Sequence, residues 1–147
     1  MTPLFVALIG GFLLFRALGL FVPWFADWQH ALRAALGLMF LLTASAHWGK
    51  RRPYLVHMVP ENIGHAELFV TLTGFAEIAI AVGLQIPRLA PWSALAAVAM
   101  LCAIFPANMK AARERLTILG KPVPTLVPRF LAQVVFIALL AVSVWPR

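Results

Sequence analysis

The sequence contains few charged residues and a single cysteine. Of its 147 residues, 12% are charged, whereas a soluble domain has about 25%. The lone cysteine, Cys102, excludes an intramolecular disulfide, a Cys-x-x-Cys redox motif and a metal site built from cysteines. The sequence has no nucleotide-binding motif, and no basic cluster interleaved with aromatic residues points to nucleic acid as a partner. The scarcity of charge therefore indicates a chain that is not surrounded by water.

Apolar residues stand where a soluble protein would carry charge. They make up 63% of the sequence, and the mean hydropathy is +0.91. We expect an all-α integral membrane protein that forms one domain over residues 1–147, a bundle of five transmembrane helices. A helix of about 20 residues crosses a hydrocarbon core of about 30 Å. The expected spans are residues 4–25, 31–49, 66–86, 89–109 and 126–145.

The first span has an alternative interpretation as a signal peptide. Residues 4–15 resemble the apolar region of such a peptide. However, no basic residue precedes them and no Ala-x-Ala cleavage site follows them. A retained first helix is the favoured interpretation.

The distribution of basic residues predicts how the bundle is oriented. With five spans, the N-terminus, the second loop and the fourth loop share one side. Cytoplasmic loops of membrane proteins carry an excess of Lys and Arg. We therefore expect the N-terminus in the cytoplasm and the C-terminus outside. The cytoplasmic side would hold Lys50, Arg51, Arg52, Lys110, Arg113, Arg115, Lys121 and Arg129, and the outer side only Arg33, Arg88 and Arg147.

The connections carry their own local signals. Residues 54–64 are expected to form a polar loop. Pro106 is expected to kink or terminate the fourth helix, because proline cannot donate a backbone hydrogen bond. Residues 110–119 have the composition of a basic helix on the membrane surface, and Gly120 would stop it.

Two charged residues are expected near the middle of the membrane. Counting about 1.5 Å per residue from the cytoplasmic end places Arg16 of the first span and Glu77 of the third at similar depth. A charge at this depth costs several kcal/mol, so we predict that they form an intramembrane charge pair. Such a pair would either fix the helix register or serve as a proton or ligand site.

A second polar group is expected near the cytoplasmic ends of four spans. The predicted ligand-binding residues are His47, Glu67, Asn108, Arg129 and Gln133. Together they would suit an anionic or quinone-like head group, with Glu67 and Arg129 as an ion pair. The alternative is that each side chain extends separately into the lipid head groups. Neither a catalytic nucleophile–base pair nor a complete metal ligand set is present, since His47 and Glu67 alone are too few ligands.

Several short motifs resemble those of DoxX-like membrane proteins. They are Leu41-Leu-Thr-Ala-Ser-Ala-His47-Trp48, Met58-Val-Pro60, Leu72-Thr-Gly-Phe-Ala-Glu77 with Val82-Gly-Leu84, Phe105-Pro-Ala-Asn-Met109, and Arg129 with Gln133. The resemblance runs from about Arg33 to the C-terminus. It implies a small bacterial plasma-membrane protein with a four-helix core, to which this chain adds an N-terminal helix. It also implies an association with redox systems, with a quinone as a conceivable cofactor.

Three functions are compatible with these features. The first is a non-catalytic subunit or anchor that binds a quinone or lipid head group and a soluble or membrane-bound redox partner. The second is a small proton-linked transporter that uses Glu77. The third is a quinone-dependent enzyme, which is disfavoured because the chain lacks a redox motif of its own.

Overall fold

The computed structural model describes residues 2–146, and these are almost entirely helical. Arg147, one of the cations expected outside, lies beyond the described residues. The helices are α1 (Thr2–Leu18), α2 (Pro23–Ala26), α3 (Trp28–Ala44), α4 (Arg52–Met58), α5 (Ala66–Gly83), α6 (Ala90–Arg113) and α7 (Leu126–Ser143). A 3-10 turn, Ser45–His47, continues α3, and a small antiparallel hairpin pairs β1 (Thr117–Ile118) with β2 (Lys121–Pro122). The expected all-α class is therefore confirmed.

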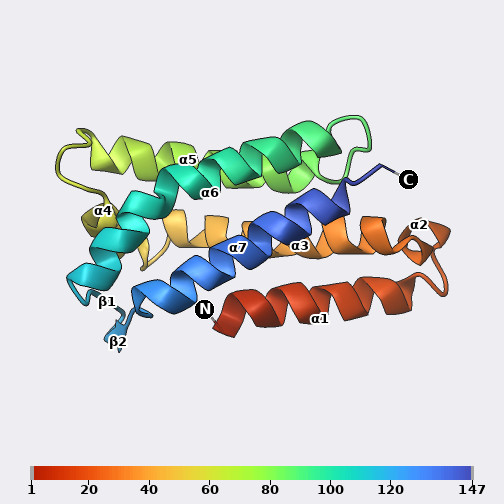
Figure 1. The fold of residues 1–147 in the computed structure, drawn as a ribbon, viewed down its shortest axis with the longest axis horizontal. Coiled ribbons are helices and arrows are strands. Elements are labelled where there is room, and N and C mark those ends of the chain that lie inside the picture. Colours follow the sequence, from red (N-terminus) through yellow and green to blue (C-terminus); the bar gives the residue numbers. More distant parts are fainter. Residues whose placement is uncertain (1, 147) are drawn as a thin grey trace.

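Five long helices lie side by side and alternate in direction (Figure 1). Helices α1, α5 and α7 run one way, and α3 and α6 run the other way. We name the end of the bundle that holds α4, the β hairpin and the first turns of α5 and α7 the α4 end, and the opposite end the α2 end. Helix α3 packs against α1, α5 and α7, and α6 completes the bundle by packing on α5 and α7.

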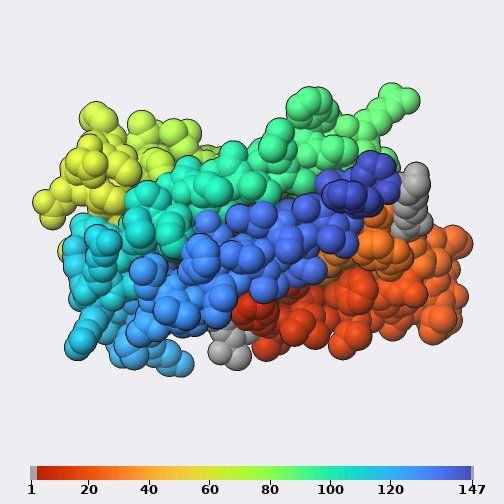
Figure 2. Space-filling view, viewed as in Figure 1, coloured from red at the N-terminus to blue at the C-terminus, as the bar shows by residue number. Residues whose placement is uncertain are grey.

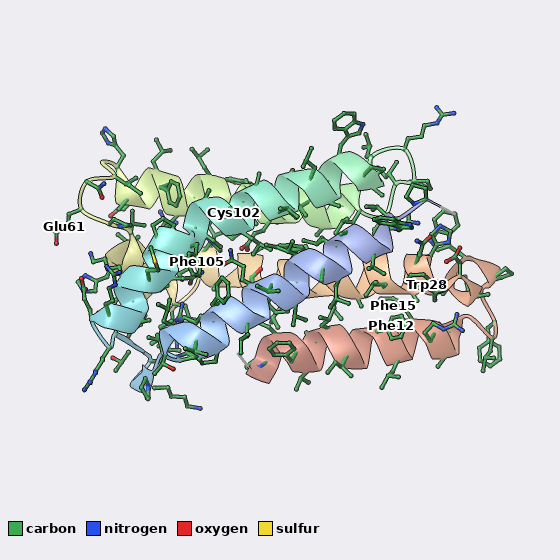
Figure 3. The ribbon with its side chains drawn as sticks, viewed as in Figure 1. Phe12, Phe15, Trp28, Glu61, Cys102 and Phe105 are labelled. Atoms are coloured by element: carbon green, nitrogen blue, oxygen red, sulfur yellow. The ribbon has the colours of Figure 1, made fainter. Side chains whose placement is uncertain are left out.

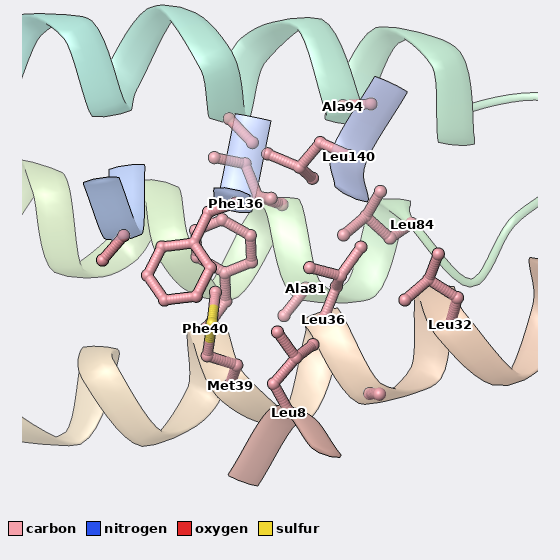
Figure 4. Close-up of a cluster of buried hydrophobic side chains, with 14 residues drawn as sticks. Leu8, Leu32, Leu36, Met39, Phe40, Ala81, Leu84, Ala94, Phe136 and Leu140 are labelled. Atoms are coloured by element: carbon pink, nitrogen blue, oxygen red, sulfur yellow. The ribbon is translucent and has the colours of Figure 1, made fainter. Parts of the chain in front are cut away.

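The core lies around α3, where the other helices meet (Figure 4). Leu36 and Phe40 of α3 are fully buried, as are Leu84 and Leu140. Leu8 from α1 closes the cluster on one side. Small residues such as Ala35 and Ala97 bring the helix backbones close together.

Much of the outer surface is apolar. Large exposed side chains line the flanks of the helices, including Leu72 and Phe75 on α5, Leu95 on α6 and Leu131 on α7. Most side-chain nitrogen and oxygen atoms lie near the two ends of the bundle (Figure 3). Water-soluble monomers rarely expose so much continuous apolar surface. This surface suits the hydrocarbon region of a membrane.

Three helices in the described part of the chain, α5, α6 and α7, are long and apolar enough to cross a membrane. A fourth crossing results if α3 with its 3-10 turn and α4 count as one broken span, although the two parts are bent by 92°. Helix α1 is also apolar but shorter, over Pro3–Leu18. The five expected spans thus correspond to five helices, of which three meet this length and composition test unaided.

The first helix ends earlier than expected, at Leu18 instead of Phe25. The chain turns at Gly19, where a Cβ atom would lie 2.6 Å from the carbonyl oxygen of Phe25. Glycine therefore permits a close approach between the end of α1 and α2. As a result, Arg16 lies in the last turn of α1, at the α2 end of the bundle.

Two connections differ from the expectations, whereas Pro106 follows the first of its two expected outcomes, a kink. The first half of the expected loop 54–64 is helical, as α4. Helix α6 continues through Pro106 to Arg113, and its ribbon bends in its second half (Figure 1), so Pro106 does not end the helix. The expected surface helix 110–119 is wrong beyond Arg113, because Arg115, Leu119 and Gly120 adopt positive φ angles and the chain forms the β hairpin.

Candidate functional site

A buried histidine and a buried glutamate meet between α3 and α5. His47 Nδ1 lies 3.6 Å from Glu77 Oε2. The two residues are only 9% and 6% exposed. No other acid–base pair this close occurs within residues 2–146. We name His47 and Glu77 the buried pair.

The local backbone explains how the two side chains come together. Helix α3 tightens into the 3-10 turn at Ser45–His47, which ends α3 against α5. Gly74 of α5 faces His47, and a Cβ atom there would lie 2.8 Å from His47 Cβ. Glu77 lies three residues after Gly74, on the same side of α5. A larger residue at position 74 would therefore hold α5 away from the imidazole.

The hydrogen bonds of the pair leave part of the carboxylate unused. His47 Nδ1 is 3.2 Å from the carbonyl oxygen of Thr43. Because a carbonyl oxygen only accepts, Nδ1 carries a hydrogen in this arrangement. The Thr43 hydroxyl donates to the carbonyl oxygen of Phe40 at 2.8 Å. Glu77 Oε2 is buried without a hydrogen-bond partner in the described structure. Such an atom can accept a proton or a hydrogen bond from a bound molecule.

Arg52 fixes the backbone around the buried pair. Its guanidinium donates to the carbonyl oxygen of His47 at 2.9 Å and to that of Glu67 at 3.1 Å. It also donates to the Thr71 hydroxyl at 2.9 Å, and this hydroxyl donates to Glu67 O at 2.9 Å. One side chain from α4 thus ties the end of α3 to the first turns of α5. In the sequence, Arg52 stands out only as one of several basic residues at this end.

Two aromatic residues pack together on the outer surface beside His47. Trp48 follows His47 directly, and its ring packs edge-on against Phe75 with centroids 5.2 Å apart. Both rings are exposed, Trp48 by 45%. The His47 and Trp48 rings are 6.0 Å apart. An exposed aromatic patch therefore adjoins the buried pair at His47.

A second polar contact joins α6 to α7. Arg129 Nη1 donates to Asn108 Oδ1 at 2.6 Å, and Arg129 Nε donates to the carbonyl oxygen of Pro124 at 3.1 Å. Gln133 lies one turn further along α7 and is half-buried. These contacts hold the first turn of α7 against the bent half of α6.

The structure separates the five residues that were expected to share a pocket. His47 joins Glu77, whereas Asn108 joins Arg129. The expected ion pair between Glu67 and Arg129 is absent from the described contacts. Glu67 contributes its backbone carbonyl, and its side chain is exposed.

The expected pair between Arg16 and Glu77 does not form either. The Arg16 guanidinium donates to the carbonyl oxygens of Phe25 and Ala26, at the α2 end. The depth of Arg16 was counted on the assumption that the first helix begins at the cytoplasmic membrane surface, and this assumption was wrong. Figure 1 shows that α1 begins partway along the bundle, so that Arg16 reaches the opposite end. Glu77 takes His47 as its partner instead.

Metal binding receives no support from the described side chains. Within residues 2–146, no group of three or more His, Cys, Asp or Glu residues is placed to hold a metal ion. The chemistry available at the buried pair is hydrogen bonding and proton exchange, which imidazole and carboxylate groups both perform.

Comparison with known proteins identifies one family. Residues 36–145 match the model of a domain of unknown function, DUF8561. No curated protein and no solved structure matches the chain. The matched region includes the buried pair and the Asn108–Arg129 contact, and it begins within α3, after α1 and α2. The chain belongs to the DUF8561 family.

Proposed function

We propose that this chain is a multi-pass plasma-membrane subunit or anchor that serves a redox system. In this proposal it resembles DoxX-like proteins, and all five long helices cross a bacterial cytoplasmic membrane with the N-terminus inside. The chain binds a quinone or a lipid head group and a redox partner protein. The subunit itself catalyses no reaction.

The buried pair is the observation that carries the proposal. A quinone-type head group offers carbonyl or hydroxyl oxygens that need a hydrogen-bond donor and a proton acceptor. Glu77 Oε2 supplies the acceptor, and His47 supplies the donor through Nε2 when its ring is protonated on both nitrogens, because Nδ1 already donates to the Thr43 carbonyl oxygen. Glu77 Oε2 is buried and has no hydrogen-bond partner in the described structure. The exposed Trp48 ring beside His47, with the Phe75 ring packed on it, suits the approach of a flat, lipid-soluble molecule from the membrane.

The contacts between motifs support the DoxX-like part of the proposal. His47 belongs to the first motif, and Gly74 and Glu77 belong to the third. These residues pack against one another. Asn108 of the fourth motif binds Arg129, which is the next motif residue along the chain. Motif residues that meet in space are expected when they form a common site.

The distribution of charge supports the proposed orientation. The α4 end carries Lys50 and Arg51 after α3, Lys110 and Arg113 at the end of α6, and Lys121 in the hairpin. The positive-inside rule assigns such an end to the cytoplasm. The same end would face an anionic surface of a cytoplasmic partner.

The test is purification in mild detergent followed by identification of bound proteins, quinones and lipids. The wild-type chain is expected to retain a redox protein and a quinone or lipid. Glu77→Gln is expected to reduce retention of the small molecule. Glu67→Gln is the matched control, since it removes an exposed carboxylate from the same helix. Equal retention by both variants would contradict a ligand role for the buried pair.

A proton-linked carrier is the second candidate. The observation that favours it is the same buried Glu77 oxygen, which can take up and release a proton inside the bundle. Proteoliposomes decide between the two functions. Substrate flux that depends on a proton gradient and stops in Glu77→Gln would favour the carrier. Intact partner binding without flux would favour the subunit.

A further inference from the structure

The α4 end has a hollow that lies apart from the buried pair. It is an open hollow of about 470 Å³ between the second half of α6 and the loop that follows α4. Figure 2 shows the loop in yellow and the end of α6 in cyan, one above the other at the same end of the molecule. A second hollow of about 400 Å³ shares Pro60, Glu61 and Lys110 with the first. The two form one groove across this end.

The α6 wall of the hollow changes from apolar to charged along its length. Pro106, Met109, Lys110 and Arg113 line it, with spacings of three, four and seven residues from Pro106. This spacing places them on one face of the helix. Because α6 runs towards the α4 end, Pro106 and Met109 lie nearer the middle of the bundle, and Lys110 and Arg113 lie at its end. The wall therefore changes from apolar to charged along the axis of α6. A membrane lipid beside it would change from acyl chain to head group in the same direction.

The charges around the hollow are balanced. Lys110 and Arg113 provide two cations, and Glu61 and Glu114 provide two carboxylates. Asn62 adds a neutral polar side chain from the loop. Glu61 lies at the outer tip of the molecule (Figure 3), so its carboxylate stands at the mouth. A purely anionic head group would meet both signs of charge here, whereas a head group with both signs would find a partner for each.

A hydrogen bond holds the two walls together. Lys110 Nζ donates to the carbonyl oxygen of Val59 at 3.2 Å. Val59 and Met58 are buried, so the start of the loop is fixed against the bundle. The hollow therefore exists without a ligand, and binding does not have to order the loop first.

We propose that this hollow binds a phospholipid whose head group carries a phosphate and a primary ammonium, as in phosphatidylethanolamine. Arg113 and Lys110 bind the phosphate. Glu61 and Glu114 bind the ammonium group. Pro106 and Met109 contact the glycerol and the first part of the acyl chains. This site is independent of the ligand proposed for His47 and Glu77, so that either proposal can fail alone.

The test uses the full chain reconstituted in vesicles with equal amounts of phosphatidylethanolamine and phosphatidylglycerol. After mild extraction, native mass spectrometry measures the lipids that stay bound. Wild-type protein is expected to retain phosphatidylethanolamine preferentially. Arg113→Gln should lower retention of both lipids roughly tenfold, the effect of losing one charge-assisted hydrogen bond. The double change Glu61→Gln with Glu114→Gln should abolish the preference while retaining phosphatidylglycerol.

Lys121→Gln is the matched control, because this exposed cation lies at the same end but outside the hollow. If Lys121→Gln reduces binding as much as Arg113→Gln, the effect is one of diffuse surface charge and the proposal is wrong. Equal retention of the two lipids by the wild type would also overturn it. Should Arg113→Gln fail to fold, Glu61→Gln on the exposed loop still decides the preference.

Discussion

Arg52 joins α4 to α5, the next helix along the chain, since its guanidinium donates to the Thr71 hydroxyl at 2.9 Å. The same guanidinium holds the backbone carbonyl of His47. The polar turn that ends α3 is thereby fixed to α5. His47 reaches Glu77 only because this end of α3 stays in place.

Loss of Arg52 should therefore destabilise the bundle. Arg52→Ala removes three hydrogen bonds from a charged donor, and the His47 carbonyl oxygen loses its guanidinium partner, whereas the Glu67 carbonyl oxygen keeps the Thr71 hydroxyl. We expect a loss of about 1–3 kcal/mol in the free energy of unfolding. The measurement is thermal or denaturant unfolding in detergent.

Arg51→Ala is the matched control for Arg52. Arg51 is the neighbouring residue and is exposed, and surface changes of this kind usually stay within about 0.5 kcal/mol. If both variants lose equal stability, the effect comes from net charge and the role given to Arg52 is wrong.

The buried pair should show non-additive energetics. His47→Leu or Glu77→Leu alone leaves the other polar group buried near the new apolar side chain. Each single change is expected to cost several kcal/mol. The double change should recover about 0.5–3 kcal/mol relative to the sum of the two. A double-mutant cycle of unfolding free energies gives this coupling directly, and strictly additive losses would show that the 3.6 Å contact carries no energy.

Gly74 should tolerate no side chain. A Cβ atom there would lie 2.8 Å from both His47 Cβ and the Trp48 ring, so Gly74→Ala must push α3 and α5 apart. We expect a loss of about 1–3 kcal/mol, in the range of overpacked cores. Gly10→Ala is the control, since it lies in α1 with nothing within 4 Å of the added atom. Its higher helix propensity predicts a gain of up to about 1 kcal/mol. A stable Gly74→Ala would indicate that α5 is free to shift.

Hydropathy predicted the helices, but not how each one ends. The spans expected at 66–86, 89–109 and 126–145 correspond to α5, α6 and α7, because long apolar runs are strong signals. The end of α1 depends on the approach of Gly19 to Phe25, which is a tertiary contact. The hairpin after Arg113 depends on backbone angles at Arg115 and Leu119 that non-glycine residues rarely adopt.

The site was predicted only in part for a similar reason. Counting residues placed His47 and Glu67 near one end and Glu77 deeper, and so it kept His47 and Glu77 apart. In the structure α3 tightens into a 3-10 turn at Ser45–His47. Because Gly74 has no side chain, the imidazole can approach α5 closely enough to reach Glu77. Asn108 and Arg129 were correctly assigned to the same polar group, because both lie within two turns of the α4 end, Asn108 near the end of α6 and Arg129 near the start of α7. Which residues pair depends on where their side chains point, and the depth of a residue along its helix does not reveal this.

The Asn108–Arg129 contact should require arginine specifically. Arg129 uses Nε for the Pro124 carbonyl and Nη1 for Asn108 Oδ1. Lysine carries its charge on one nitrogen and does not reproduce this fork. Arg129→Lys is thus expected to lose about 1–2 kcal/mol of stability, close to the loss in Arg129→Ala. Unfolding in detergent measures both, and full stability in Arg129→Lys would show that charge alone is sufficient.

Orientation in the membrane is the last prediction, and it separates the two ends of the bundle. Single cysteines at Arg115, next to the hairpin, and at Arg88, in the turn between α5 and α6, place one thiol at each end. Cys102 is exposed on α6 and must first be replaced by serine. In intact bacterial cells, an impermeant thiol reagent should label position 88 and leave position 115 unlabelled until the membrane is opened. This follows because the α4 end carries most of the basic residues, and the positive-inside rule places that end in the cytoplasm.

Labelling at 115 but not at 88 would reverse the orientation and remove the cytoplasmic partner surface from the α4 end. Labelling at neither position before the membrane is opened, and at both afterwards, would contradict the membrane crossing of α5 and α6.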